Sequence, residues 1–592
     1  MADSPQRAVS TPQTLPSIPD VDLQPGPLDD FLRDLYKSEH VQKSYEEFLS
    51  QLIEASKAGV PLDTSHPFSH YFISSSHNTY LTQNQLSGSA SVDGYINALR
   101  RGARCIEIDV WNGKNGEPKV VHGWTLVEPI EFKIVCEAIA ANAFETSPYP
   151  LLLSLETHCD YEQQGAMARI MHETFGDMLL SRPLNPFKVL PTLEELKNKI
   201  IIITASTSER DDDTEGGSRN NDEDGSDAES IKSDVSDASK ASSERNSGPV
   251  EQSGQAEKIT DSSPNPHLAA LGIYAIPRPF ESFFNKFSLE FNHIHNVSER
   301  MFSKLQNKPP SDIDVKDLPD DEKLTPRAVI LHNSTYLMRI YPNGYRFNSS
   351  NPYPPLYWAY GTQIVALNWQ KVDKANMLNQ ALFEGTGGYV LKPDSVMNNG
   401  EQLDTSLSDN IHEMTRKFKE SLHMLRSSER LKPTTHSNAE PQVKRTGTLN
   451  VRVIGVQNMP IPSASSIEDP SELKPYVKIE IIQSHVEDKR LDDIGIPSKS
   501  HVLKETIGRS KTLRGPTAVW DYCQKCNINS DLAFVRFKIY HNDGIFGKND
   551  PSLWWASRVG NFKEGYSLLR LYTMNGAIAD PSVLLLVQFS WC

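Results

Sequence analysis

A strand–helix alternation that stops and later resumes is the feature that most constrains how this chain can fold. Between residues 69 and 204 short apolar strands alternate with helical segments, and apolar strands return after residue 263. The strand candidates are Tyr71–Ser74, Arg104–Val110, Lys119–His122, Leu151–Glu156, Ile200–Thr204, Ala328–His332, Leu337–Ile340, Gln363–Asn368 and Tyr389–Lys392. Such alternation predicts a parallel sheet, and a count of about eight strands favours one (β/α)₈ barrel interrupted by an insert.

The insert itself is strongly acidic. Residues 206–263 consist almost entirely of Ser, Asp, Glu, Gly and Asn, with 16 acidic and 6 basic residues and therefore a net charge of −10. This composition predicts a disordered linker over residues 206–267. The formal charge of the whole chain is −16, which argues against a nucleic-acid binder, but the chain outside the insert is only mildly acidic and compatible with an anionic lipid surface.

The length of 592 residues predicts three or four domains. From residue 447 the pattern becomes all-β, which predicts a β-sandwich, and a helical pattern precedes the barrel. The predicted layout is a disordered 1–27, helices in 28–61, barrel halves in 62–205 and 268–395 around the linker 206–267, a polar linker with a helix in 396–446, and the sandwich in 447–592.

Cysteine usage and the N-terminus bear on the compartment. The six cysteines show no disulfide-framework spacing, which predicts a reducing environment. Cys523 and Cys526 form a CxxC that is either a pair of ordinary thiols in a β-rich domain or a zinc or redox site. We find no signal-peptide pattern in residues 1–27 and no apolar run of the roughly 18 residues that a membrane span needs.

Polar side chains gather at the ends of the predicted strands. The oxygen-bearing residues are Asn78, Glu107, Asp109 and Glu156, and histidines stand at positions 77 and 122. A lone Glu-x-Asp in a strand is usually a solvated face, but here apolar residues alternate with the two carboxylates. In a barrel, such residues meet at the carboxyl ends of the strands. Oxygen donors favour a hard cation such as Ca²⁺, and His77 and His122 could serve a phosphodiester reaction as acid and base.

Three segments resemble a known family. Ser69–Leu81 is similar to the opening of the X half of eukaryotic phosphoinositide-specific phospholipase C. Arg339–Pro342 and Gly387–Pro393 resemble its Y half. The resemblance covers roughly residues 28–592 and implies EF-hand-like helices, a split (β/α)₈ TIM barrel and a C-terminal C2-type sandwich, in a delta-like layout without a pleckstrin-homology domain.

The resemblance implies a mechanism. Asn78, Glu107, Asp109 and Glu156 would bind a catalytic Ca²⁺. Glu107, or alternatively Asp109, would remove the proton of the inositol 2-hydroxyl, which attacks phosphorus and gives a cyclic phosphodiester. His77 would stabilise the transition state, and His122 would protonate the departing diacylglycerol oxygen. The products would be diacylglycerol and inositol phosphates.

The resemblance also implies substrate and membrane contacts. Arg339 would grip a ring phosphate, Tyr341 would stack on the inositol ring, and Asn296 would occupy a phosphate-binding position. Apolar rim residues would enter the bilayer, although without the resemblance they could equally be loop core; they are Leu86, Trp124, Leu126 and Tyr345.

This sequence departs from the family pattern at the ring phosphates. Members of the family usually carry two lysines just after the fifth strand, and in this sequence Ile203 and Ala205 stand at those positions. The loss of two cationic contacts should weaken discrimination for the 4,5-bisphosphate, so phosphatidylinositol or its monophosphate could be competitive substrates.

Other interpretations remain open. The sandwich either is structural or holds a second Ca²⁺ with residues among Asp469, Asp521, Asp543 and Asp550, with His541 at one expected aspartate position. The acidic linker is either an inert spacer or autoinhibitory. A glycerophosphodiester phosphodiesterase and a catalytically weak lipid-binding scaffold are the competing functions. We expect a cytoplasmic monomer that acts peripherally on phosphoinositide lipid at the cytoplasmic face of membranes, with no nucleic-acid partner and no activator recognisable from the sequence.

Overall fold

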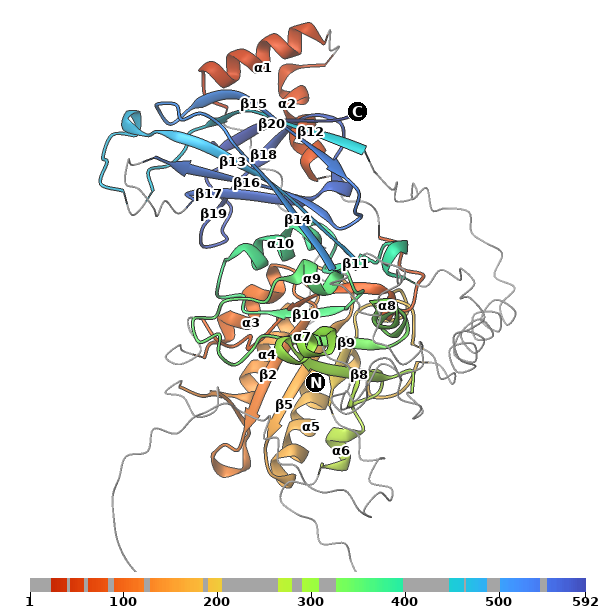
Figure 1. Cartoon of the computed structure of the whole chain (residues 1–592). Helices are drawn as coiled ribbons and strands as arrows, with labels where there is room; N and C mark the ends of the chain where they lie inside the picture. The colour runs from red at the N-terminus through yellow and green to blue at the C-terminus, as the bar shows by residue number, and fades with distance from the viewer. Residues whose placement is uncertain are drawn as a thin grey trace, which may run out of the picture. The chain divides into compact units, whose positions relative to one another are not determined.

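The structure is a computed structural model of the chain (Figure 1). It describes residues 23–39, 43–57, 62–82, 90–121, 128–184, 190–204, 264–278, 290–307, 326–397, 447–462, 465–486, 501–542 and 551–592. Two compact units are present. One contains residues 62–376 and 387–435, and the other contains residues 1–61, 377–386 and 436–592.

The larger unit is built on eight parallel strands. They hydrogen-bond in the order β6–β5–β2–β1–β10–β9–β8–β7, so the row begins and ends at the two strands that flank the acidic insert. Their bounds are β1 Tyr71–Ser76, β2 Cys105–Trp111, β5 Leu151–His158, β6 Ile200–Ile203, β7 Ile276–Arg278, β8 His293–Ser298, β9 Leu337–Tyr341 and β10 Ile364–Leu367. The predicted split barrel is confirmed.

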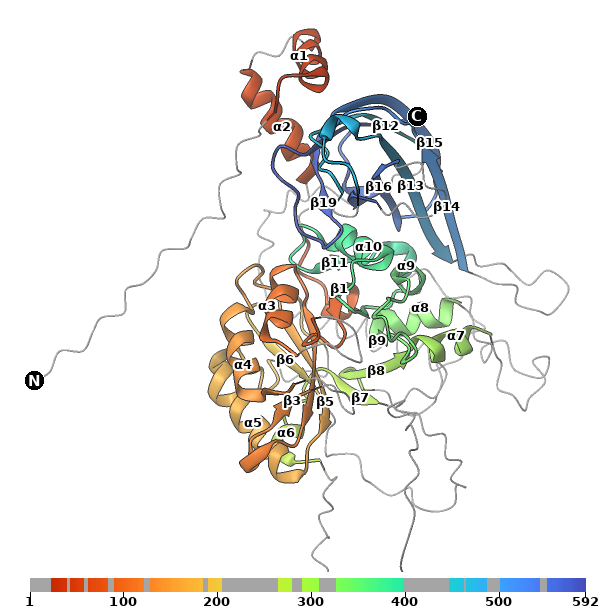
Figure 2. The ribbon, with the colours of Figure 1, turned by 90° about the vertical axis from the view of Figure 1, so that its left-hand side faces the viewer.

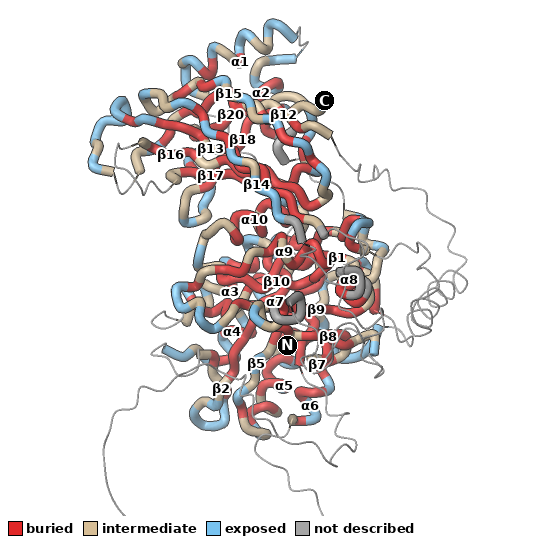
Figure 3. The backbone as a smooth tube through the Cα atoms, viewed as in Figure 1, coloured by how far each residue is buried: buried red, intermediate tan, exposed pale blue. Residues whose placement is uncertain are grey.

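Both faces of β1, β2, β6 and β10 are buried along nearly their whole length, as is typical of parallel strands in an α/β fold, whereas the last four residues of β5 are partly exposed. On β2, Ile106 and Ile108 pack against the helices, while Cys105 belongs to a second cluster with Leu152 and Ile364 in the barrel interior. Figure 2 shows α3, α4 and α5 along one side of the strands, and Figure 3 shows the buried strands in red. The helices of this fold are α3 Val92–Arg100, α4 Phe132–Asn142, α5 Tyr161–Phe175, α6 Pro266–Ala269, α7 Glu299–Asn307, α8 Pro326–Thr335 and α9 Pro354–Trp358. A further helix, α10 (Lys374–Phe383), begins in this unit, but its residues from Met377 onward belong to the other.

Three strand predictions need correction. Ala328–His332 is wrong, because this run lies in α8; four apolar residues in a row fit a helix as well as a strand. Lys119–His122 contributes only β3 (Lys119–Val120), an antiparallel partner of β2 and β4 (Ile130–Glu131). Tyr389–Lys392 gives β11 (Tyr389–Leu391), which pairs antiparallel with β1 and is not a barrel strand.

Strands β7 and β8 escaped the sequence prediction. β8 reads His293-Ile294-His295-Asn296-Val297-Ser298, and its two apolar residues are three positions apart, so it shows no period-2 apolar alternation. β7 has three residues, which is too short for any period to emerge.

The smaller unit is a two-sheet β-sandwich, which confirms the predicted C2-type fold. One sheet has the order β15–β12–β20–β18 and the other β14–β13–β16–β17–β19. The strands are β12 Gly447–Gln457, β13 Pro475–Val486, β14 His501–Arg509, β15 Ala518–Ile528, β16 Ala533–His541, β17 Leu553–Arg558, β18 Gly565–Arg570, β19 Tyr572–Thr573 and β20 Leu584–Trp591.

Two N-terminal helices belong to this second unit. They are α1 (Pro27–Ser38) and α2 (Tyr45–Lys57). Leu32 of α1 and Phe48 of α2 share one buried cluster with Leu568 and Leu586 of the sandwich, so burial of the apolar helix faces stabilises both helices.

Several predictions fall outside the described residues. These include nearly all of the segments predicted to be linkers, 1–27, 206–267 and 396–446. Within the part of the chain that is described, no helix is long and apolar enough to cross a membrane.

Candidate active site

Three acidic side chains converge at the carboxyl ends of β2 and β5. The alternation of β2 turns Glu107 and Asp109 to the same side as Cys105, into the barrel interior. The register then places Asp109 opposite Glu156 of β5. One carboxylate oxygen from each of Glu107, Asp109 and Glu156 lies within 4.8 Å of the others. The structure therefore brings together the three carboxylates that the sequence singled out.

Glu107 lies at the centre of a buried polar network. Its Oε2 accepts a hydrogen bond from the backbone N–H of Asn78 at 2.9 Å, and its Oε1 accepts one from Arg339 Nη2 at 2.5 Å. Burial acts to raise the pKa of Glu107, but the positive charge of Arg339, followed by His77, outweighs burial and holds this pKa below its usual value. Glu107 is therefore an ionised carboxylate inside the barrel.

Asp109 is held differently. The Tyr80 hydroxyl donates a hydrogen bond to Asp109 Oδ2, whereas the buried Oδ1 has no hydrogen-bond partner among the described residues. Burial, followed by repulsion from Glu156 and Glu107, raises the pKa of Asp109 well above its usual value. A divalent cation among the three carboxylates would relieve this repulsion and give Oδ1 a partner. The all-oxygen donor set thus fits a hard cation.

The loop after β1 positions Asn78 beside this centre. Asn78 has φ 42°, in the left-handed region that asparagine tolerates better than most residues. The loop also lies close against α3. A Cβ at Gly94 would stand 2.3 Å from the carbonyl oxygen of Thr79, so only glycine permits this approach. Thr79 Oγ1 in turn accepts a hydrogen bond from the Glu107 N–H at 3.1 Å.

His77 directly follows β1, and its side chain is 17% exposed. Its Nδ1 lies 3.0 Å from Asn368 Oδ1, and its Nε2 lies 3.8 Å from Glu107 Oε2. Burial, aided by the charge of Arg339, lowers the pKa of His77 despite the opposing influence of Glu107. The sequence analysis missed Asn368, although a polar residue directly after the apolar strand β10 is the kind of signal that marks a barrel site.

His158 is a further histidine that the sequence analysis did not assign. Its Nε2 lies 2.8 Å from Glu156 Oε1, and its ring stacks on Trp111 with centroids 4.0 Å apart. Trp111 and His158 are register partners on β2 and β5, so their stacking holds the His158 imidazole in the orientation in which it contacts Glu156.

The predicted substrate residues lie on the neighbouring strands β8 and β9. Arg339 is buried, bound to Glu107, and its Cζ lies 5.7 Å from the centre of the Tyr341 ring. Asn296 is the register partner of Arg339, and its buried Oδ1 accepts no hydrogen bond from the part of the chain that the structure describes. These three residues thus line one side of the same barrel, with Arg339 engaged by the Glu107 carboxylate.

Of the predicted rim residues, only Tyr345 is described. It lies in the loop after β9 and is 64% exposed, and Phe347 in the same loop is 47% exposed. Arg346 between them pairs with Glu299 at 2.5 Å and so anchors the loop. The other predicted rim residues, Leu86, Trp124 and Leu126, lie outside the described residues. His122 lies outside them as well.

Of the sandwich residues considered for a second Ca²⁺, the described ones belong to no possible metal-binding group. Asp521 is engaged by both sides of the Arg452 guanidinium, at 2.5 and 3.0 Å. Asp469 caps the backbone at Ser471, and His541 Nδ1 accepts the Lys474 N–H. Asp543 and Asp550 lie outside the described ranges.

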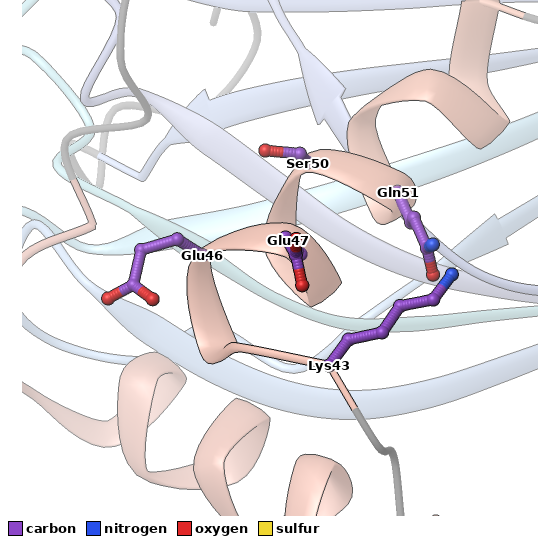
Figure 4. Close-up of a pocket in the computed structure, with 5 residues that line it drawn as sticks. All are labelled: Lys43, Glu46, Glu47, Ser50 and Gln51. Atoms are coloured by element: carbon purple, nitrogen blue, oxygen red, sulfur yellow. The ribbon is translucent and has the colours of Figure 1, made fainter.

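Two further features carry no site chemistry. Cys523 is exposed and Cys526 is buried on β15, and neither belongs to a possible metal-binding group among the described residues. Figure 4 shows an open hollow beside α2, lined by Lys43, Glu46, Glu47, Ser50 and Gln51. It lacks histidines and lies in the other unit from the carboxylate centre.

The fold and the site together define a split-barrel protein with an acidic centre at the carboxyl ends of its strands. Residues 64–206 match the family model for the X domain of phosphatidylinositol-specific phospholipase C, and residues 268–395 match the model for its Y domain. The chain is 31% identical to mouse 1-phosphatidylinositol 4,5-bisphosphate phosphodiesterase zeta-1, with 88% of this chain and 73% of that protein covered. The chain belongs to the phosphoinositide-specific phospholipase C family, which excludes the glycerophosphodiester phosphodiesterase alternative.

Other relatives agree. The chain is 30% identical to 1-phosphatidylinositol 4,5-bisphosphate phosphodiesterase 1 of Candida albicans, over 88% of this chain and 47% of that protein. The crystal structure of S. officinalis PLC21 superposes with a TM-score of 0.63 at 24% identity, covering 95% of this chain and 62% of that chain, which supports the fold. The chain spans about half the length of some curated relatives, 47% of the Candida protein and 57% of zebrafish delta-3-A.

Proposed function

We propose that this protein is a calcium-dependent phosphodiesterase that cleaves inositol phospholipids into diacylglycerol and inositol phosphates. The observation that carries the proposal is the convergence of Glu107, Asp109 and Glu156 beside His77 and Arg339 in one barrel. The relatives named as phosphatidylinositol 4,5-bisphosphate phosphodiesterases support this substrate class.

Calcium is the proposed cation because every donor is an oxygen. Glu107, Asp109 and Glu156 would hold it together with the side chain of Asn78. The bound ion would lower the pKa of the inositol 2-hydroxyl and neutralise charge on the phosphoryl group.

Glu107 is the proposed general base. It is ionised and buried, so it can take the 2-hydroxyl proton while the 2-oxygen forms a bond to phosphorus. The bond from phosphorus to the diacylglycerol oxygen breaks, and that oxygen takes a proton from His122, giving a cyclic phosphodiester and diacylglycerol. His77, oriented by Asn368, stabilises the phosphoryl oxygens in the transition state. Water then opens the cyclic product with His122 as base.

Head-group choice follows from the barrel interior near β6. Ile203 is buried in the interior cluster with Ile201, where the family resemblance implies a phosphate-binding lysine, and Ala205 lies outside the described residues. Hydrogen bonds to charged groups contribute about 1.5–3 kcal/mol each, so two missing lysines remove roughly 10²-fold or more of the preference for the bisphosphate.

We therefore expect broad use of phosphoinositides. In vesicles, turnover of phosphatidylinositol and of its 4-phosphate should come within about tenfold of turnover of the 4,5-bisphosphate, because little charge-assisted binding favours the extra phosphates. Release of each water-soluble inositol phosphate is the measurement. A strict preference for the bisphosphate would contradict the head-group proposal, and no release from any of the three lipids would contradict the proposed function itself.

Membrane access is proposed to be peripheral. The exposed rings of Tyr345 and Phe347 suit the bilayer interface, and Arg346 with Glu299 holds their loop in place. The protein is proposed to act as a monomer at the cytoplasmic face of membranes. The domain boundaries predicted from the sequence are likewise part of this proposal.

A further inference from the structure

Glu156 is the least protected of the three carboxylates that converge in the barrel. Its side chain is 55% exposed, whereas the side chain of Glu107 is 5% exposed. Glu107 is fixed by Arg339 and by a backbone N–H. Asp109 is fixed by the Tyr80 hydroxyl. A glutamate that rotates freely loses that freedom when it binds a cation, and the lost entropy weakens binding. Whatever fixes Glu156 therefore affects the affinity of the site.

His158 supplies the hydrogen bond that holds Glu156. A carboxylate oxygen accepts, so His158 Nε2 donates its N–H to Glu156 Oε1, and the two atoms lie 2.8 Å apart. Among the described residues, no other hydrogen bond engages the Glu156 carboxylate. One hydrogen bond to Oε1 leaves the remaining lone pairs of the carboxylate for a cation. The imidazole therefore sets the direction in which this carboxylate points.

Trp111 supports the imidazole from the neighbouring strand. Trp111 and His158 are the register pair two residues beyond Asp109 and Glu156, towards the carboxyl ends of β2 and β5. Side chains two residues apart on a strand share a face, so the two rings lie directly beyond the carboxylates on the same face. The ring planes are inclined by only 19°, with centroids 4.0 Å apart. This stacking restricts rotation of the imidazole.

The segment that follows Trp111 is anchored to α5. Gln163 of α5 is 7% exposed and clamps the backbone of Gly113. Its Oε1 accepts the Gly113 N–H at 2.9 Å, and its Nε2 donates to the Gly113 carbonyl oxygen at 3.2 Å. A Cβ at Gly113 would lie 1.9 Å from the carbonyl oxygen of Glu117, so the close packing of this segment requires glycine. These contacts fix the end of β2 and with it the indole against which the imidazole stacks.

We propose that His158 is a positioning residue for the cation site, acting by holding the Glu156 carboxylate in its binding orientation. This inference rests on the proposed function, because it requires that Glu156 binds calcium together with Glu107 and Asp109. His158 limits the rotamers of Glu156 before the cation binds, and Trp111 limits those of His158. Removing a hydrogen-bond partner of a metal ligand typically weakens metal binding by about 10–100-fold.

Calorimetric titration of the full-length chain with calcium chloride, in the absence of lipid, tests this role. His158→Phe keeps an aromatic ring against Trp111 but removes the N–H, so calcium should bind at least about tenfold more weakly. His158→Gln can still donate an N–H to Glu156 and should stay within about threefold of the unmodified chain. In excess chelator the two variants should have similar melting temperatures, because the His158 side chain is 31% exposed. Calcium should then raise the melting temperature of His158→Phe less than that of His158→Gln.

The matched control is His172→Phe, which makes the same substitution at an exposed position of α5 and should leave calcium affinity unchanged. A double variant tests whether His158 acts through Glu156. In Glu156→Gln, adding His158→Phe should weaken calcium binding by less than about twofold, because the carboxylate that the imidazole holds is absent. Equal calcium affinity in His158→Phe and the unmodified chain, or a further loss of about tenfold in the double variant, would overturn this inference and leave the proposed function intact. Failure of the unmodified chain to bind calcium would overturn both.

Discussion

Glu107→Gln is expected to reduce inositol phosphate release by at least 10²–10⁴-fold, the usual contribution of a general base. The substitution removes the proton acceptor and weakens one ligand of the proposed cation while nearly preserving side-chain volume. Because the base acts in the chemical step, kcat should fall far more than KM rises. A variant that retains turnover within tenfold of the unmodified enzyme would assign the base elsewhere, with Asp109 as the next candidate.

The same substitution has a separate structural consequence. Arg339 would keep its buried charge without the Glu107 carboxylate, and breaking a buried pair from one side typically costs about 3–5 kcal/mol. A lower melting temperature is therefore expected for Glu107→Gln. The double variant Glu107→Gln with Arg339→Met removes both charges and should recover much of the melting temperature. It should not recover turnover, which separates the catalytic loss from misfolding.

His77→Ala is expected to lower kcat by about 10²–10³-fold, the usual cost of removing one group that stabilises charge in the transition state. The His77 ring is 17% exposed, with its Nε2 3.8 Å from Glu107 and its Nδ1 3.0 Å from Asn368 Oδ1. The measurement is initial-rate kinetics on vesicle substrate at saturating calcium. His172→Ala, at an exposed position on α5, is the matched control and should retain full activity.

An unchanged kcat in His77→Ala would remove this residue from the mechanism. A result in which KM rises while kcat is retained would instead assign His77 to substrate binding. Calcium titration of both histidine variants distinguishes either outcome from a loss of the metal site.

The sequence predicted the parallel barrel because its X half has apolar strands and amphipathic helices of clear period. Prediction failed where local pattern and tertiary context disagree. The run Ala328–His332 has strand-like composition but lies in a helix, and β8 has only two apolar residues, Ile294 and Val297, on opposite faces. Asn296 is the register partner of Arg339, whereas the His295 ring on the other face lies 5.1 Å from the His332 ring of α8, and a sequence window reveals neither contact.

The carboxylates were predictable from their position at strand ends, but their partners were not. Arg339 and Glu107 are 232 residues apart, and only the closing of β9 and β10 onto β1 brings them together. The contacts of Tyr80 with Asp109, Asn368 with His77 and His158 with Glu156 likewise depend on strand register.

The most direct test is inositol phosphate release from phosphoinositide vesicles, first with free Ca²⁺, then with excess chelator, then after Ca²⁺ is restored. We predict that release falls to background in chelator and returns fully with the ion, and that Asp109→Asn shifts the response to higher calcium, since the cation requires this carboxylate. Release that continues at the same rate in chelator would contradict a catalytic cation held by Glu107, Asp109 and Glu156.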